Sequence, residues 1–446
     1  MGTDGQLSSL VDLIANATKV VEAHYQKSSK PFVPSLDDIE PHPFDNSVLD
    51  KELRNAIQTI EGACAQLAAT VARPGHTLVN VFETSCLNVV ATFKIPDILE
   101  EKPAGMHISE IGKVTGLDER KIGRILRLLA SKHCFREVSK NVFTNNRLSI
   151  QLLSNNPISS ISLHFTDECA KSGVLLSETL ADPEWGPSRS PYQCPFNRYT
   201  KYPKTLFDYY EGIGSPEAAM RGARFGIGMV GWGNAIEAGA VISEFPWAEL
   251  GEGGVVCDVG GGIGNISMQL AHKYPWLKLI LQDLPERIQQ ARNEIWPKEC
   301  PLAIQEDRVQ FKPIDFFNES PVKDCDAYYL KNIIHDWPDA DCIRILSHIK
   351  NAMGPHSRVL IQEYILQYAN RVTDGESKFQ QAPEPLLPNY GAGRIRQYNL
   401  DIDMMNMLNS EERTVDEFIK LGEAAGLHFT KVWDIGELGV IEFRLP

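Results

Sequence analysis

Apolar residues recur at helical spacing near the N-terminus and form short continuous runs after residue 254. Over residues 7–27, six apolar side chains fall on one face and predict an amphipathic helix: Leu10, Leu13, Ile14, Ala17, Val20 and Val21. A Pro- and Ser-rich linker follows, and helical spacing resumes at about Asn46. From Gly254, runs such as VVCDVG, LKLILQD and CDAYYLKNI alternate with helical patterns. This alternation predicts a parallel sheet covered by helices on both faces, closed by a C-terminal antiparallel hairpin.

Residues 106–146 have the order of a winged helix-turn-helix. A helix, a Gly-Leu turn, a second helix and two short strands around SKN follow one another. A DNA-reading helix here would present four basic residues, Arg120, Lys121, Arg124 and Arg127, but its many apolar residues leave a single polar face. An interaction or dimerisation module is therefore favoured over a DNA-binding one.

The chain is expected to divide into four parts. They are an N-terminal helix and linker (1–45), a winged-helix dimerisation domain (46–155), a helical connection around the substrate pocket (156–245) and the sheet domain (246–446). A polar segment rich in Gly and Pro, 367–397, interrupts the last part and is typical of a lid or a loop without regular structure.

Charge and cysteine content narrow the class of protein. The net charge of −14 argues against duplex DNA and anionic membranes as partners. Nine scattered cysteines without a CxxC pair predict free thiols in a reducing compartment and no metal site. The N-terminus does not have the pattern of a signal peptide, and apolar runs stay short of membrane-spanning length, so a cytoplasmic location is expected.

A glycine-rich turn follows the first strand of the sheet domain. In VVCDVGGGIGNIS, Asp258 precedes Gly260, Gly262 and Gly264, which allow a tight turn and close approach of a ligand to the backbone. The dinucleotide fingerprint needs its third glycine where this chain has Asn265. The spacing suits S-adenosylmethionine (SAM) instead.

Acidic residues at the ends of the next two strands strengthen the SAM interpretation. Asp283 ends LKLILQD, where its carboxylate can bind both ribose hydroxyls. Asp315 and Phe316 follow the next strand and suit the adenine amino group and ring face. Each acid alone could be a helix cap, but all three in order predict a SAM site.

Over residues 75–446 the chain resembles the class I plant- and fungal-type small-molecule O-methyltransferases. The winged-helix segment, DVGGGIGN, QDLP, HDW and the closing EERTVDEFIKLGEAAGL carry the resemblance. It implies a Rossmann-like methyltransferase sheet, a winged-helix N-terminal domain that forms homodimers, and SAM as cofactor. Within these motifs it adds Leu284, Lys331 and Trp337 to the cofactor-binding residues.

The resemblance also implies a general base. The histidine before Asp-Trp in the family takes the proton of the acceptor hydroxyl, and His335 matches it, with Glu363 and Glu412 at the positions of two orienting acids. A neutral imidazole with an ordinary pKa of roughly 6.5 suits this work near neutral pH. A capping or packing role for His335 is the alternative.

A smaller group in this family, the fungal O-methyltransferase-like pericyclases, is closer in appearance because of Lys331, Met407 and the 367–397 insertion. Such enzymes dehydrate a polyketide-pyridone alcohol and steer a hetero-Diels–Alder or ene-type cyclisation, with SAM unconsumed. Lys331 would polarise a carbonyl, and His164, or His335 with Asp336, would assist loss of water. Apolar side chains would form the pocket wall: Phe207, Tyr210, Phe225, Met229, Met404 and Met407. We expect a pericyclase, with O-methylation of a small aromatic or polyketide hydroxyl as the alternative.

Overall fold

The computed structural model describes residues 6–72, 83–212, 215–373 and 378–446. Two antiparallel helices begin the described chain, α1 (Gln6–Gln26) and α2 (Lys51–Val71), with a short helix η1 (Pro43–Asp45) between them. Asp50 caps α2 by accepting a hydrogen bond from the Leu53 N–H at 3.0 Å. The predicted N-terminal helix is therefore confirmed.

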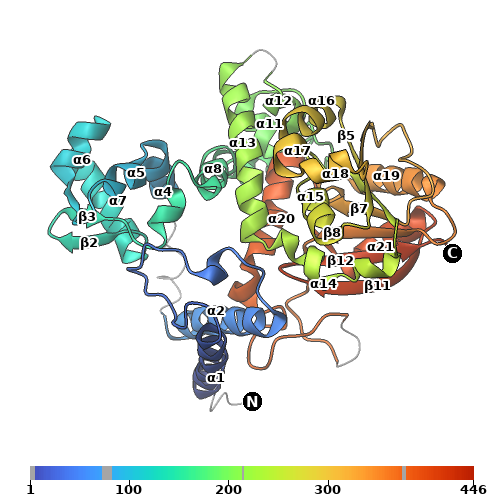
Figure 1. The fold of residues 1–446 in the computed structure, drawn as a ribbon. Coiled ribbons are helices and arrows are strands. Elements are labelled where there is room, and N and C mark those ends of the chain that lie inside the picture. The colour runs from blue at the N-terminus through green and yellow to red at the C-terminus, as the bar shows by residue number, and fades with distance from the viewer. Residues whose placement is uncertain (1–5, 73–82, 213–214, 374–377) are drawn as a thin grey trace.

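A winged-helix module follows, apart from the sheet domain in Figure 1. Its core is a buried apolar cluster that includes Leu126 and Phe143. The predicted order of helix, turn, helix and two strands is confirmed, and β1 adds to β3 to give a small antiparallel sheet, β1-β3-β2. The elements are α4 (Glu83–Thr92), α5 (Ile95–Glu100), β1 (Met106–His107), α6 (Ile108–Thr115), α7 (Glu119–Ser131), β2 (Arg136–Ser139), β3 (Val142–Thr144) and η2 (Ser149–Leu152).

Short helices connect this module to the sheet domain. The long helix α13 (Pro216–Ala235) packs tightly on α8 (Pro157–His164) because small residues line the contact: a Cβ on Gly231 would lie 2.6 Å from the Pro157 carbonyl carbon. The other elements are η3 (Phe165–Cys169), α9 (Ala170–Gly173), α10 (Leu176–Ala181), α11 (Pro195–Thr200), α12 (Leu206–Tyr210), η4 (Ala238–Ala240), α14 (Val241–Glu244) and η5 (Trp247–Leu250).

The sheet domain has a seven-stranded sheet in the order β11-β12-β8-β7-β4-β5-β6. Strands β4 to β8 are parallel, whereas β12 runs antiparallel to β8 and to β11, so the predicted parallel sheet and closing hairpin are confirmed. Two apolar clusters, one on each face, form its core. The strands are β4 (Val255–Val259), β5 (Lys278–Asp283), β6 (Val309–Pro313), β7 (Ala327–Lys331), β8 (Arg358–Glu363), β11 (His428–Ile435) and β12 (Leu438–Arg444).

Helices lie along both faces of this sheet (Figure 1). They are α15 (Asn265–Lys273), α16 (Pro285–Gln290), η6 (Ala291–Ile295), α17 (Trp296–Glu299), α18 (Pro301–Gln305), α19 (Asp339–Ala352) and α21 (Val415–Ala424). The short helix η7 (Ile334–Asp336) follows β7, η8 (Gly391–Arg394) packs on α2, and α20 (Ile395–Leu408) packs on α9 and α11. A short parallel pair, β9 (Ile365–Leu366) and β10 (Arg413–Thr414), joins the ends of β8 and α20.

The polar segment 367–397 packs against the N-terminal helices. Ala382, Leu386 and Tyr390 share a buried cluster with Leu10 and Ala63. The backbones meet closely, because a Cβ on Gly393 would lie 2.2 Å from the Gln58 carbonyl oxygen. Residues 374–377 lie outside the described ranges, residues 368–373 are exposed, and residues 382–393 form part of a packed layer with α1 and α2.

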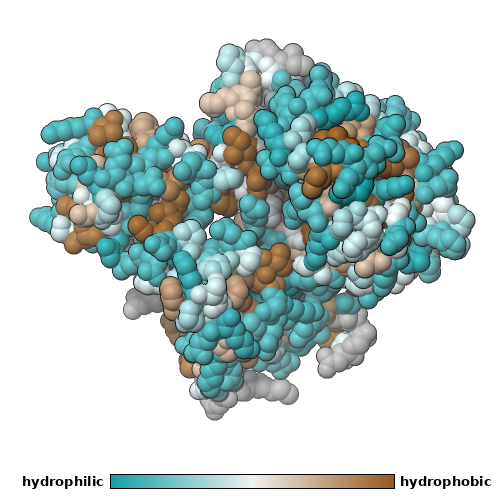
Figure 2. Space-filling view, in the orientation of Figure 1, coloured by the Kyte–Doolittle hydropathy of each residue, from teal (hydrophilic) through white to brown (hydrophobic). Residues whose placement is uncertain are grey.

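Figure 2 shows a mainly hydrophilic surface with apolar patches over the winged-helix module and beside α13. Within the described ranges, no single helix is both long and apolar enough to cross a membrane; one bent pair, Pro216–Ala235 with Ala238–Glu244, meets the length and composition criteria together. The cysteines are unpaired, and most are buried.

Candidate active site

The glycine-rich turn joins β4 to α15 at the carboxyl edge of the sheet. The backbone φ angles of Gly260, Gly262 and Gly264 are +73°, +59° and +91°. Residues other than glycine rarely adopt such positive angles. A Cβ on Gly264 would lie 2.7 Å from Trp296 Nε1, whereas one on Gly262 would meet no atom within 4 Å. The turn is thus packed from below and open at Gly262, and α15 begins there without a side-chain cap on its amides.

Asp283 lies beside this turn, at the end of β5. Its Oδ2 accepts a hydrogen bond from the Gly262 N–H at 2.7 Å and its Oδ1 one from the Leu284 N–H at 2.7 Å. Burial raises the pKa of Asp283, and the two amide bonds oppose this effect. The Leu284 side chain is exposed. The acid is therefore fixed at the open side of the turn.

Asp258 lies below the turn. Ser267 Oγ donates a hydrogen bond to Asp258 Oδ2 at 2.6 Å, and the side chain is buried. A Cβ on Gly261 would collide with its carboxyl carbon at 2.5 Å. Burial raises the pKa of Asp258 to about 6, although Ser267 and Lys331 lower it. Asp258 therefore supports the turn from inside the fold.

An aromatic group borders the turn on the β6 side. Phe317 meets Trp337 edge to face at 4.7 Å, and Phe316 packs on Phe317 at 4.8 Å. Asp315 is exposed, and its oxygens accept from the Phe317 N–H and from Asn318 Nδ2. Apolar ring surfaces and an acidic turn thus lie together beside Gly260.

His335 lies in η7, directly after β7 and a short loop, within a buried acidic cluster. Its Nδ1 lies 2.6 Å from Glu412 Oε1, and its Nε2 lies 3.5 Å from Asp336 Oδ1. Burial opposes the charge on the imidazole, but Glu412 and Asp336 outweigh it and raise the pKa of His335 to about 10. This differs from the neutral imidazole expected from the sequence, because a carboxylate at 2.6 Å stabilises the imidazolium.

Glu363 contacts the backbone of the His335 loop instead of the imidazole. Its Oε1 accepts from the N–H groups of Ile333, Ile334 and His335 at 3.0, 2.6 and 3.2 Å. Burial raises its pKa to about 7. Of the two acids expected to orient the histidine, Glu412 touches the ring and Glu363 fixes the loop that carries it.

Lys331 ends β7 between the glycine turn and the His335 loop. It is half-buried, and burial lowers its pKa, while the charges of Asp258, Glu363 and Asp336 oppose that change. Asp258 lies on the glycine-turn side of Lys331, and Glu363 and Asp336 lie on its His335 side. The ammonium therefore lies between them, at the carboxyl edge of the sheet.

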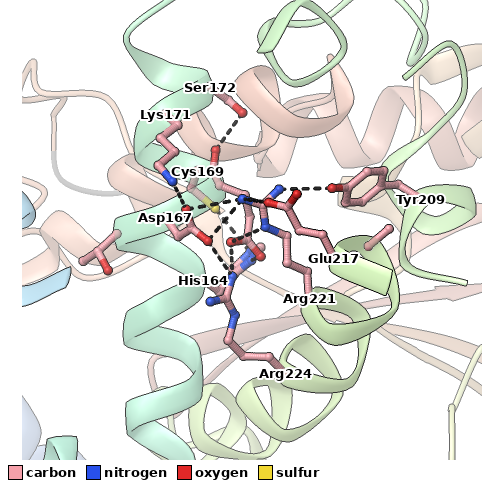
Figure 3. Close-up of polar contacts among 12 residues, drawn as sticks. His164, Asp167, Cys169, Lys171, Ser172, Tyr209, Glu217, Arg221 and Arg224 are labelled. Carbon is pink, nitrogen blue, oxygen red and sulfur yellow. Dashed lines mark hydrogen bonds and ion pairs between the residues drawn. The ribbon is translucent and has the colours of Figure 1, made fainter. Parts of the chain in front are cut away.

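His164 belongs to a different cluster, drawn in Figure 3. Its Nδ1 lies 3.0 Å from Glu168 Oε1 and 3.1 Å from the Tyr210 hydroxyl, and its Nε2 lies 3.2 Å from Cys169 Sγ. Arg224 pairs with Glu168. His164 and His335 therefore have separate sets of partners. Helix α20 contacts both clusters, because its Asp401 accepts from the Glu412 N–H at 2.9 Å and its Asp403 lies beside His164 and Cys169.

Several of the predicted pocket residues share one apolar cluster: Phe207, Tyr210, Met404 and Met407. The ring centroids of Phe225 and Tyr210 lie 4.9 Å apart in a stacked arrangement, and those of Phe207 and Trp337 lie 6.0 Å apart. The Phe207–Trp337 contact joins this apolar cluster to the carboxyl edge of the sheet, where the glycine turn lies. Met407 is only 1% exposed and is therefore a core residue in this structure. Met229 is half-buried on α13.

The sequence did not indicate other polar residues that shape these sites. Arg413 is buried and donates to the carbonyl oxygens of Ile334 and Trp337, which holds the His335 loop from behind. Ser267 anchors Asp258. The spacing of Glu168 four residues after His164 was the one available signal for the second cluster.

Two family models match the chain: an O-methyltransferase dimerisation domain over residues 76–155 and an O-methyltransferase domain over residues 233–428. A curated relative, 3-O-methyltransferase 2 of Phanerochaete chrysosporium, is 43% identical over 442 residues, which cover 98% of this chain and 97% of the relative. The chain belongs to the O-methyltransferase family. O-methyltransferase gedA of Aspergillus terreus is 36% identical and covers 86% of this chain and 85% of its own length.

Solved structures share the fold of this chain. LepI in complex with SAM aligns with a TM-score of 0.70 at 18% identity, covering 98% of this chain and 100% of LepI. OxaC in complex with SAH and oxaline has a TM-score of 0.70 at 20% identity and covers 100% of both chains. At these identities the likeness shows the fold alone.

SAM is the cofactor of this family, and the site fits it. The molecule carries a carboxylate, ribose hydroxyls and an adenine ring. The uncapped N-terminus of α15 suits the carboxylate, and Asp283 suits the ribose hydroxyls. The rings of Phe316 and Trp337 suit the adenine ring. The open space at Gly262 leaves room for a ligand against the backbone.

Proposed function

We propose that this chain transfers the methyl group of SAM to a hydroxyl of a small aromatic substrate, with His335 as general base. The observation that carries the proposal is the buried His335–Glu412 pair, with 2.6 Å between Nδ1 and Oε1, at the same edge of the sheet as the glycine turn. When bound, SAM supplies an electrophilic methyl group; the protein must supply a base and hold the hydroxyl in line.

The pair is tuned for a weakly acidic hydroxyl. A phenol has a pKa of about 10, as tyrosine does, and the pKa of His335 is raised to about 10. Proton transfer from a phenol to the unprotonated ring is close to balanced in free energy because the two pKa values are similar, and below a pKa of about 10 only the unprotonated fraction of His335 can act as the base. An aliphatic alcohol, several units less acidic, is a poorer match.

The chain's own residues divide the work. Glu412 fixes the Nδ1 proton, which leaves Nε2 as the atom that accepts the substrate proton. Glu363 and Arg413 hold the loop that carries His335. The rings of Phe207, Tyr210 and Phe225 provide apolar surface on which an aromatic acceptor can lie and from which water is excluded.

The relatives support the same reaction class. They include 3-O-methyltransferase 2 and 4-O-methyltransferase 1 of Phanerochaete chrysosporium, the latter 32% identical over 399 residues. We propose a ring hydroxyl as acceptor and a homodimer formed through residues 76–155, the range of the matched dimerisation domain.

The pericyclase interpretation stays a prediction. Lys331, which would polarise a substrate carbonyl, faces Asp258, Asp336 and Glu363 and has a lowered pKa. That setting suits a group at the cofactor edge better than a free cation in a substrate pocket. LepI, at 18% identity, supports the fold and not the reaction.

The test is a paired product assay with SAM and a panel of mono- and dihydroxylated benzene derivatives. We expect a gain of one methyl group together with release of S-adenosylhomocysteine, and the loss of both in His335→Gln. Methyl transfer at full rate in that variant would overturn the base assignment.

A further inference from the structure

Three potential metal ligands meet where α8, η3 and α20 pack together. His164 Nε2, Cys169 Sγ and a carboxylate oxygen of Asp403 all lie within 4.8 Å of one another. The Nε2–Sγ distance is 3.2 Å. In a tetrahedral zinc site, Zn–S and Zn–N bonds place these two atoms about 3.5 Å apart. A small rearrangement would therefore let one ion contact all three.

Glu168 Oε1 lies 3.0 Å from His164 Nδ1, and the Tyr210 hydroxyl lies 3.0 Å from the same oxygen and 3.1 Å from Nδ1. A proton on Nδ1 that is donated to Glu168 leaves Nε2 as the ring atom available to a metal ion. Nε2 is the ring nitrogen beside Cys169 Sγ.

The charges of the neighbouring groups are balanced without Asp403. Three carboxylates, Asp167, Glu168 and Glu217, pair with three cations, Lys171, Arg221 and Arg224 (Figure 3). Asp403 is 9% exposed, and within the described residues it forms no ion pair with Lys or Arg at 4.0 Å or less. A divalent cation with one thiolate, one carboxylate and a neutral imidazole would make the group electrically neutral.

The histidine is already oriented as metal-bound histidines are. A ligating histidine commonly donates its other N–H to a carboxylate, which fixes the tautomer and the ring plane. Glu168, which is fully buried, takes this role toward His164, and Arg224 in turn holds Glu168.

We propose that His164, Cys169 and Asp403 form a zinc-binding site, with Glu168 as a positioning residue. Thiolate, imidazole and carboxylate together are typical zinc ligands. Three protein ligands leave one coordination position for water or for an oxygen of a bound molecule. The site adjoins the proposed pocket wall, since the His164 and Phe225 rings lie 5.2 Å apart. The sequence predicted no metal site, and this proposal does not depend on methyl transfer.

The test uses the full-length chain, stripped of metal by a chelator and then titrated with Zn²⁺ or Co²⁺ at neutral pH. We expect stoichiometric binding, and for Co²⁺ a thiolate-to-metal charge-transfer band in the near ultraviolet. Cys169→Ser removes the band, and Asp403→Asn weakens binding at least tenfold. Glu168→Gln weakens it by about 10- to 100-fold.

Cys194→Ser is the matched control. Cys194 is buried in the same apolar cluster, but its Sγ contacts Asn197 and the Met407 carbonyl oxygen, so this variant should bind as the wild type does. A wild-type chain that shows no thiolate band, or that binds metal no better than Cys169→Ser, overturns the proposal. Binding at the group of His24, Asp50 and Glu52 would give no such band, because that group contains no thiol. If Cys169→Ser fails to fold, the wild-type spectrum and Asp403→Asn still decide.

Discussion

Replacing Glu412 by glutamine removes a buried charge next to His335 and keeps a hydrogen-bond acceptor of the same shape. Glu412 Oε1 lies 2.6 Å from His335 Nδ1, and the two residues are 3% and 6% exposed. Burial alone would lower the pKa of His335; Glu412 is the largest of the opposing contributions that raise it to about 10. The variant therefore isolates the electrostatic part of the contact.

The size of the effect follows from the contact. A hydrogen bond to a charged group contributes about 1.5–3 kcal/mol, and one pKa unit corresponds to about 1.36 kcal/mol. Glu412→Gln should therefore lower the pKa of His335 by about one to two units. Because only the unprotonated imidazole is a base, wild-type kcat/KM should rise about tenfold per pH unit below a pKa of about 10. In the variant this rise should level off about one to two units earlier, at a lower plateau.

The assay is the pH dependence of kcat/KM for methyl transfer, which reports the free enzyme. Glu411→Gln is the matched control, because this neighbouring side chain is 41% exposed and pairs with arginines instead of His335. Its profile should coincide with that of the wild type. An unchanged profile in Glu412→Gln, or an equal shift in the control, would show that the 2.6 Å contact does not set the basicity of His335.

Three further predictions concern the base, the cofactor edge and the glycine turn. His335→Gln should lower kcat by about 10²- to 10⁴-fold while calorimetry shows unchanged SAM affinity; loss of SAM binding would point to a structural role instead. Asp283→Ala should weaken SAM binding at least tenfold because two amides fix this carboxylate at the open side of the turn; equal affinity would remove it from the cofactor site. Gly264→Ala should lower the melting temperature, since φ is +91° and the new Cβ would lie 2.7 Å from Trp296 Nε1. Gly262→Ala is strained by its positive φ but meets no neighbouring atom, so it should lower the melting temperature less than Gly264→Ala and weaken SAM binding more. The opposite pattern would mean that the cofactor does not approach the turn at Gly262.

The sheet domain could be predicted because its signals are local. Parallel strands buried on both faces read as continuous apolar runs, and β4, β5, β7 and β8 all do. The glycine turn and Asp283 follow directly from strand ends. The winged helix was likewise visible from its caps and turn, with Gly116 in a left-handed conformation after α6.

Side-chain direction at the strand ends was not predictable in the same way. Asp258 is the penultimate residue of β4 and Glu363 the last residue of β8, but Asp258 turns inward to Ser267 and Glu363 turns to the backbone amides of a loop. These directions depend on how the following loop returns over the sheet. The cluster of His164, Cys169 and Asp403 was hidden for a related reason, because it needs a π-type turn after α8 and a helix from a distant part of the chain.

The central claim is that a methyl group leaves SAM for a substrate hydroxyl. The most direct measurement follows substrate mass and S-adenosylhomocysteine in the same reaction with the purified full-length chain. The account predicts one methyl gained for each S-adenosylhomocysteine released, with both lost in His335→Gln. Conversion of a polyketide-pyridone alcohol to a dehydrated cyclic isomer while SAM stays intact, with no methylated product from the phenol panel, would contradict it.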